Sequence, residues 1–176
     1  MRYLELKKYP DPCLRIKTKS VENFDQELKS ILKKMADIMY VSQGIGLAST
    51  QVGLGSSIFV VDEGKGLINF INPEIIESSE EKSGMEEGCL SLPGVQVCVY
   101  RPVAVKIRAQ DENGKFFVKR YDGLMAKAVQ HENDHLNGKL IIDYLNPIRR
   151  FISKLHLHRE GKKTCEVICD ARKNDI

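Results

Sequence analysis

Six short β-branched runs occupy the middle of this chain, between two segments with helical spacing. The last two runs flank Asn113-Gly114, a dipeptide that favours the tight turn of a β-hairpin. Antiparallel strands placed between helices are typical of an α+β domain. The predicted strands are Ile58–Asp62, Leu67–Ile71, Glu74–Glu77, Val95–Tyr100, Val103–Ala109 and Lys115–Tyr121.

Apolar residues at three- and four-residue steps predict the helices. The first is expected to start at Asn23 or Asp25 and to end by Gly44, and the second to run over Leu124–Asn137. A short third helix is expected to begin near Pro147. The expected fold is therefore α+β, with antiparallel β-sheets packed around a central helix, an N-terminal helix and a short C-terminal helix or tail.

Length and composition narrow the class of protein. The 176 residues suit one domain, and no apolar run approaches the roughly 18 residues that cross a bilayer. The first residues lack the apolar segment of a signal peptide, so we expect a cytoplasmic protein. Five cysteines at irregular spacing make a poor disulfide framework and leave thiols for metal binding or catalysis. Of these, Cys13 and Cys98 are expected to be structural.

The positive charge lies at the C-terminal end. Residues 147–176 carry eight Lys or Arg and four Asp or Glu, whereas the rest of the chain is almost neutral. Such a tail can dock on an RNA-rich or anionic surface, although a solvated terminus is the simpler interpretation. Basic residues interleaved with aromatic ones occur nowhere else, so recognition of a specific nucleic-acid sequence is not expected.

The second helix contains the motif HENDH at 131–135. Histidines four residues apart lie on one helical face, where their ring nitrogens can converge on one ion. Leu124 and Ala128 place this face in the apolar stripe that should point inward. Glu132 lies at the edge of the stripe, where it can reach a water on the ion without being a ligand. The alternative is a chance glutamate between two ordinary histidines, but the motif and its register favour a metal site.

A catalytic site of this kind usually takes a third protein ligand. One protease class would supply a histidine three residues after a glycine. Here the glycine is Gly138, but the position three residues later is Ile141. Another class uses a downstream glutamate, and Glu160 and Glu166 both lie in the polar tail. Cys89 remains as a candidate, although a lone cysteine is more often a small core residue.

Three segments in order, GIGLASTQ (44–51), EGCLS (87–91) and HENDH (131–135), resemble the signature motifs of peptide deformylases. KYPDPCLR near the start and GKLIIDYLNP after the third motif extend the resemblance over about residues 3–150. The resemblance implies an enzyme that removes the formyl group from the N-terminal formylmethionine of new bacterial or organellar proteins and releases formate. Residues 1–150 would form the catalytic domain, and 151–176 a basic helix or tail, partly disordered.

The resemblance also implies a role for each matching residue. Cys89, His131 and His135 would bind the metal, and metal-bound water would attack the formyl carbon with Glu132 as general acid and base. The Gln51 amide and the Leu90 backbone N–H would hold the reacting oxygen. Gly46 would bond the substrate backbone, Arg101 and Asp134 would form a pair that supports the ligand helix, and the residues near the methionine side chain would be Ile45, Met85, Glu87, Leu124 and Ala128.

The family typically uses Fe(II) in cells, with zinc, nickel or cobalt able to occupy the same site. One thiolate with two imidazoles suits zinc equally well, so the ligand set alone does not select iron. The expected partners are N-formylmethionyl nascent peptides and, through the basic tail, the ribosome; no membrane partner is expected. Two other hypotheses remain, namely a zincin-like endopeptidase and a closed structural metal site in a catalytically silent relative.

Five features depart from the family pattern. Ser49 and Asn133 are expected to leave the site intact, and three others affect the substrate contacts or the C-terminal end. Lys127 stands where many members have an apolar residue; pointing inward it would narrow or charge the methionine pocket, and pointing outward it would matter little. Gln96 often is arginine in bacterial relatives, which puts distal substrate contacts in doubt. The CEVIC segment (165–169) replaces a basic helical tail, and its two cysteines are expected to be free or disordered thiols.

Overall fold

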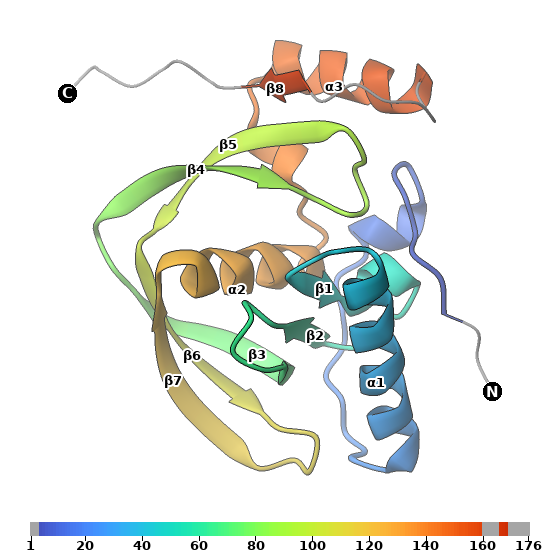
Figure 1. Ribbon diagram of the computed structural model, residues 1–176, viewed down its shortest axis with the longest axis vertical. Coiled ribbons are helices and arrows are strands. Elements are labelled where there is room, and N and C mark those ends of the chain that lie inside the picture. Colours follow the sequence, from blue (N-terminus) through green and yellow to red (C-terminus); the bar gives the residue numbers. More distant parts are fainter. Residues whose placement is uncertain (1–3, 160–165, 169–176) are drawn as a thin grey trace.

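A computed structural model describes residues 4–159 and 166–168. Helix α2 (Gly123–Leu136) lies at the centre, with β4 and β5 on one side and β3, β6 and β7 on the other (Figure 1). The strand orders are β1-β2-β3-β6-β7 and β4-β5-β8, and the α+β prediction is confirmed. The strands are β1 (Gly46–Ala48), β2 (Ile58–Val61), β3 (Ile68–Ser78), β4 (Lys82–Gly88), β5 (Val95–Pro102), β6 (Ala104–Gln110), β7 (Phe116–Asp122) and β8 (Glu166–Ile168).

Helix α1 (Gln26–Val41) confirms the first predicted helix. The Asp25 side chain caps it by accepting a hydrogen bond from the backbone N–H of Leu28 at 3.0 Å. Its apolar stripe packs against β1 and β2, which leaves Met35 and Met39 fully buried. The helix ends three residues before Gly44, because Gln43 adopts a positive φ of 57° that no α-helix can continue.

The sheet confirms the predicted hairpin and corrects one pair of strands. Strands β6 and β7 pair antiparallel across a turn in which Gly114 has a φ of 80°. The runs predicted as two strands at 67–71 and 74–77 are one strand, β3, whose register shifts between Ile71 and Glu74. Asn72 lies in this bulge with a φ of 51°, and its side chain bonds the backbone of Val21 in both directions.

Strands β1, β4 and β8 were not predicted. β1 lies inside the glycine-rich segment and pairs with β2, and β4 is a polar strand that pairs with β5. The turn between β4 and β5 carries Cys89. Two short helices also matter for the site: η2 (Ser49–Val52) follows β1, and η3 (Ile141–Tyr144) follows α2.

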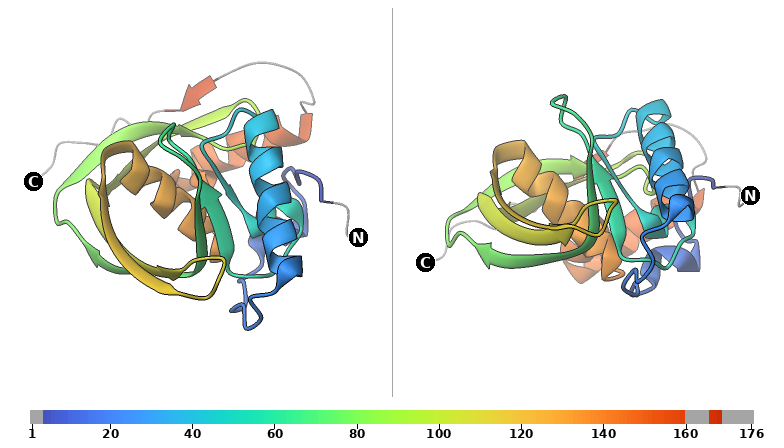
Figure 2. Two further views of the ribbon diagram at one scale, coloured as in Figure 1. Left: turned by 60° about the horizontal axis from the view of Figure 1, so that its bottom comes forward. Right: turned by 90° about the horizontal axis from the view of Figure 1, so that it is seen from below.

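Helix α2 is more deeply buried than a single apolar stripe predicts. Glu132, expected at the edge of the stripe, is 4% exposed, and Lys127, whose orientation the sequence left open, is 6% exposed. Leu124, expected to point inward, is 45% exposed instead. Both sheets wrap the helix, as the two views of Figure 2 show, so most of its residues are buried; Gly123 and Leu124 in its first turn are exposed, and Asn133 and Asp134 near its end are half-buried.

The C-terminal part contains helix α3 (Pro147–Arg159), which begins where the sequence predicted. Strand β8 lies parallel to β5, beside Val95–Val97. Cys165 and Cys169 lie outside the described residues, whereas Cys13 and Cys98 are half-buried and free of disulfides. Among the described helices, none has the length and apolar character needed to cross a membrane.

Candidate metal centre

Cys89, His131 and His135 come together although 42 to 46 residues separate the cysteine from the histidines. One ligand atom from each lies within 4.8 Å of the others. The two imidazoles project from successive turns of α2, with ring centroids 5.0 Å apart, and Cys89 Sγ lies 3.3 Å from His135 Nε2. One thiolate and two imidazoles in this proximity suit a transition-metal ion, so the donor set fits the expected cofactor.

Glu87 orients the first histidine. Its Oε2 lies 2.9 Å from Nδ1 of His131, which leaves Nε2 of that ring for an ion. The sequence placed Glu87 near a substrate methionine, but both of its carboxylate oxygens are also bonded to Arg101, at 2.6 and 3.0 Å. Glu87 borders the cavity, yet its charge is directed to His131 and Arg101. A carboxylate behind a ligand histidine fixes the ring and raises its basicity.

Arg101 of β5 links Glu87 of β4 to Asp134 of α2. Besides Glu87, its guanidinium contacts Asp134 at 2.8 Å, so the pair expected from the sequence is present. The hydroxyl of Tyr144 donates to the same Asp134 oxygen at 2.7 Å and accepts from Arg101 at 3.0 Å. Arg101 is 3% exposed, and its bonds to these acceptors offset the cost of burying its charge. Sequence analysis missed Tyr144, since nothing local marks it.

The titratable groups of the site differ in the direction in which their surroundings shift the pKa. Burial disfavours a charged His131, but hydrogen bonds with Cys89 and Glu87 outweigh this and raise its pKa well above the usual value. Burial and the neighbouring His131 instead lower the pKa of His135. Burial also opposes ionisation of Glu87, but bonds from His131 and Arg101 hold its pKa below the usual value.

Glu132 lies beside the ligands, buried, with Oε2 making no hydrogen bond to any described group. Burial raises the pKa of its carboxyl to about 7. Gly46 of β1 packs directly on this carboxylate, since a Cβ at position 46 would lie 2.9 Å from both Cγ and Cδ of Glu132. A buried carboxyl with an unused oxygen is suited to accept and release a proton.

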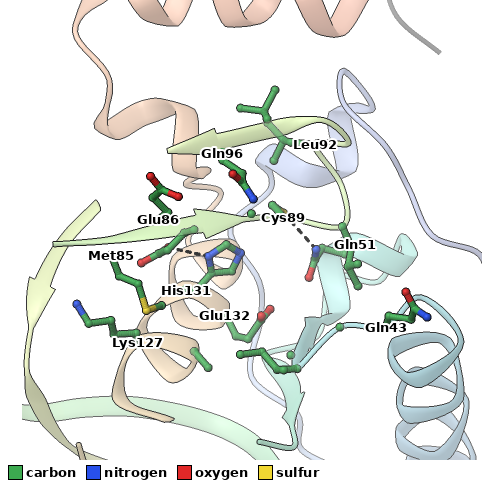
Figure 3. Close-up of a pocket in the computed structure, with 18 of the residues that line it drawn as sticks. Gln43, Gln51, Met85, Glu86, Cys89, Leu92, Gln96, Lys127, His131 and Glu132 are labelled. Atoms are coloured by element: carbon green, nitrogen blue, oxygen red, sulfur yellow. Dashed lines mark hydrogen bonds and ion pairs between the residues drawn. The ribbon is translucent and has the colours of Figure 1, made fainter. Parts of the chain in front are cut away.

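Gln51 presents its amide N–H₂ to the site. Its Oε1 accepts from the backbone N–H of Ala48 at 2.8 Å, which fixes the orientation of the amide. Its Nε2 then points to Ser91 Oγ at 3.2 Å. It also points to Cys89 Sγ at 3.5 Å, a contact that Figure 3 marks with a dashed line. Ser91 is a second residue that sequence analysis missed.

A cavity of about 580 Å³ opens beside these groups. Gln51, Cys89, Leu90, His131 and Glu132 border it. Gln96 and Lys127, whose positions the sequence left open, border it too. The six residues predicted to contact substrate all lie around it, namely Ile45, Gly46, Met85, Glu87, Leu124 and Ala128.

Comparison with known proteins agrees with this geometry. Residues 3–151 match the family model for polypeptide deformylase. The peptide deformylase of Borreliella burgdorferi is 45% identical over 163 residues, which cover 91% of this chain and 99% of that protein. That of Thermotoga neapolitana is 44% identical over 149 residues, covering 85% of this chain and 91% of the relative.

A solved peptide deformylase from Legionella pneumophila has a similar fold. It superposes with a TM-score of 0.83 at 39% identity, over 88% of this chain and 93% of that one. The shared fold, the family match and the identity of the relatives agree over most of the chain. The chain therefore belongs to the polypeptide deformylase family of N-terminal deformylating hydrolases.

Proposed function

We propose that this chain is a metal-dependent hydrolase that removes the formyl group from the N-terminal formylmethionine of newly synthesised proteins. Water adds to the formyl carbon, the C–N bond breaks, and formate and a free amino terminus leave. The observation that carries the proposal is the approach of Cys89, His131 and His135 to within 4.8 Å beside the buried carboxyl of Glu132.

Cys89, His131 and His135 would hold the ion. A divalent metal there supplies Lewis acidity, which activates water and polarises the formyl oxygen. We expect Fe(II) in cells, with zinc, nickel or cobalt able to replace it, since thiolate and imidazole ligands accept all of these.

We assign proton transfer to Glu132. Its unpartnered Oε2 can take a proton from the attacking water and return it to the departing amine. Burial favours this exchange, because it brings the carboxyl pKa near neutrality, where both directions of transfer are accessible. A nearby cation would lower that pKa, so the value in the working enzyme depends on both effects.

Gln51 and Leu90 would stabilise the charge that develops on the formyl oxygen. The Gln51 amide is held by Ala48, so its N–H donors need little reorganisation. The backbone N–H of Leu90, directly after Cys89, would supply a second donor. One such donor is typically worth about 3 kcal/mol of barrier.

The cavity and the edge of β1 would bind the substrate. β1 is the terminal strand of its sheet and, among the described strands, pairs with β2 alone, so its other edge can bond an extended peptide at Gly46. Ile45, Met85, Leu124 and Ala128 give the adjoining cavity apolar surface for a methionine side chain. Glu87 would act through His131 and have no direct substrate contact.

We further propose that residues 1–150 form the catalytic domain, that the protein acts in the cytoplasm, and that its basic C-terminal segment docks on the ribosome. Support for docking is the charge of residues 151–176, which contain six Lys or Arg, Lys154 of α3 among them, and four Asp or Glu. Salt-dependent cosedimentation with ribosomes tests it, and loss of binding on removal of residues 151–176 is the expected result.

The test of the main proposal is anaerobic formate release from formyl-Met-Ala-Ser with defined metals. Glu132→Gln should retain metal and lose at least about 100-fold in turnover, because the proton carrier is gone. Glu74→Gln, at an exposed ion pair with Arg108, should behave as wild type. Undiminished turnover by Glu132→Gln, or internal cleavage of an unformylated protein, would contradict the proposal.

A further inference from the structure

Lys127 is a buried lysine at the end of the cavity where Met85 lies. Only 6% of it is exposed, and its Nζ donates to the backbone carbonyl of Ser83 at 2.6 Å. Figure 3 places Lys127 and Met85 at the same end of the cavity, with His131 between them and Gln51. The aliphatic stem therefore contributes to the cavity wall, while the ammonium bonds strand β4.

Strand β4 is attached to α2 at two points. Ser83, Met85 and Glu87 alternate with exposed residues, so they share the inward face of the strand. The backbone carbonyl of Ser83 accepts a hydrogen bond from Lys127, and the carboxylate of Glu87 bonds the ring of His131. Lys127 and His131 are four residues apart on α2. Met85 lies between the two attachments.

These attachments matter because β4 is an edge strand. It pairs with β5 on one side and is the terminal strand of its sheet. The other side of β4 has no sheet neighbour among the described residues. Pairing with β5 on one side and the bonds from Ser83 and Glu87 to α2 therefore hold Met85 against the helix.

We propose that Lys127 is a specificity-determining residue, whose bond to Ser83 holds β4 against α2 and so sets the width of the pocket for the substrate side chain. An apolar residue of the same length would fill the space without fixing the strand, since packing alone lacks a directional bond. The inference rests on the proposed deformylase function and adds the residue that limits which formylated side chain fits.

The experiment compares kcat/KM for formyl-Met-Ala-Ser and formyl-Phe-Ala-Ser. Lys127→Met keeps the length and apolar surface but lacks the donor, so the Met/Phe preference should fall about tenfold, mainly through KM. Lys127→Arg keeps a donor and should restore most of the preference. The matched control is Lys106→Met, at an exposed ion pair with Glu77, which should leave the preference unchanged.

Hydrogen exchange supplies a readout independent of catalysis. Lys127→Met should exchange faster over residues 82–86, with residues 116–122 of β7 unchanged. If Lys127→Met does not fold, Lys127→Gln, whose shorter side chain cannot reach Ser83 in the same way, replaces it in both measurements.

The outcomes separate the two proposals. No formate release by metal-loaded wild type overturns the deformylase function itself. An active wild type, together with an unchanged Met/Phe preference or unchanged exchange in the Lys127 variant, overturns the role of Lys127 alone.

Discussion

Gly46 leaves room for Glu132 that no other residue would leave. A Cβ at position 46 would lie 2.9 Å from two carbons of the Glu132 side chain and closer still to its Oε1. Gly46 is in β1 and Glu132 is in α2, so the contact joins the edge of one sheet to the central helix. The family motif implied that Gly46 bonds the backbone of the substrate. The close contact with Glu132 gives a second reason for a glycine at this position.

Gly46→Ala should therefore reduce turnover by at least about 100-fold, because the added methyl displaces the carboxyl from the proton-transfer position. Metal content should stay stoichiometric, since the ligands lie elsewhere. Gly55→Ala is the control, because its new Cβ would meet only Ile16 Cδ1 at 3.5 Å. Wild-type kcat in Gly46→Ala would show that Glu132 tolerates displacement and would contradict this account.

Glu87→Gln should weaken both metal binding and folding. The change removes the charge behind His131 and leaves Arg101 buried with less compensation, so we expect about 10- to 100-fold lower metal affinity. The free energy of unfolding should fall by about 3–5 kcal/mol, as for other broken buried ion pairs. Chelator competition and urea unfolding measure the two effects.

Glu77→Gln serves as the matched control for that change. The Glu77 side chain is 61% exposed and its partner Lys106 is 38% exposed, so loss of this pair should cost under about 1 kcal/mol. Equal destabilisation by both substitutions would mean that the Glu87 pair contributes no more than a surface contact.

Local signals predicted much of the fold. The apolar residues that bury Met35 and Met39 recur at regular steps within one helix, so a short stretch of sequence reveals them. The dipeptide Asn113-Gly114 is enough to predict the turn of the hairpin. The polar strand β4 has neither kind of signal, because it is stabilised by pairing with β5 and by α2. Its existence depends on partners distant in the sequence, which no local pattern reports.

The candidate site was also predicted in part from local signals and missed where distant partners decide the geometry. Histidine spacing and the family motifs identified the three residues that converge, since their order along the chain is informative. The bond between Glu87 and His131 was missed, because it depends on which face of β4 turns toward α2. The orientation of Lys127 was left open for the same reason, because its bond to Ser83 depends on how β4 lies against α2.

Cys89→Ala should yield protein with substoichiometric metal after purification. Two imidazoles remain, but one of the three converging ligands is lost. Metal should stabilise the wild type against unfolding by about 2.7 kcal/mol at a hundredfold excess over Kd, and the variant by much less. Cys98→Ala is the control, since that half-buried thiol lies outside the ligand group. Stoichiometric metal in Cys89→Ala would place the third ligand elsewhere.

Asp143 links the end of α2 to the N-terminal segment, and its contribution to stability should depend on pH. Its carboxylate pairs with Arg15 and accepts from the backbone N–H of Leu140 at 2.8 Å. Burial favours the neutral acid, but the bonds from Arg15 and Leu140 outweigh it and lower the pKa of this carboxyl below its usual value. Because the folded-state pKa is the lower one, the stabilisation is complete above the unfolded value and is lost as pH falls through the folded value.

Asp143→Asn keeps an oxygen for the Leu140 N–H and removes the charge, so it should cost about 1 kcal/mol at pH 7. The difference from wild type should shrink as pH falls below about 4, where the wild-type carboxyl also becomes neutral. Urea unfolding of both chelator-treated proteins, from pH 7 down to the lowest pH at which each folds, measures this difference. Chelation matters because protons also displace metal from the site and would change the stability of both proteins together. A difference that stays constant with pH would show that the charge of Asp143 does not stabilise the fold, and the contact with Arg15 would then count only as packing.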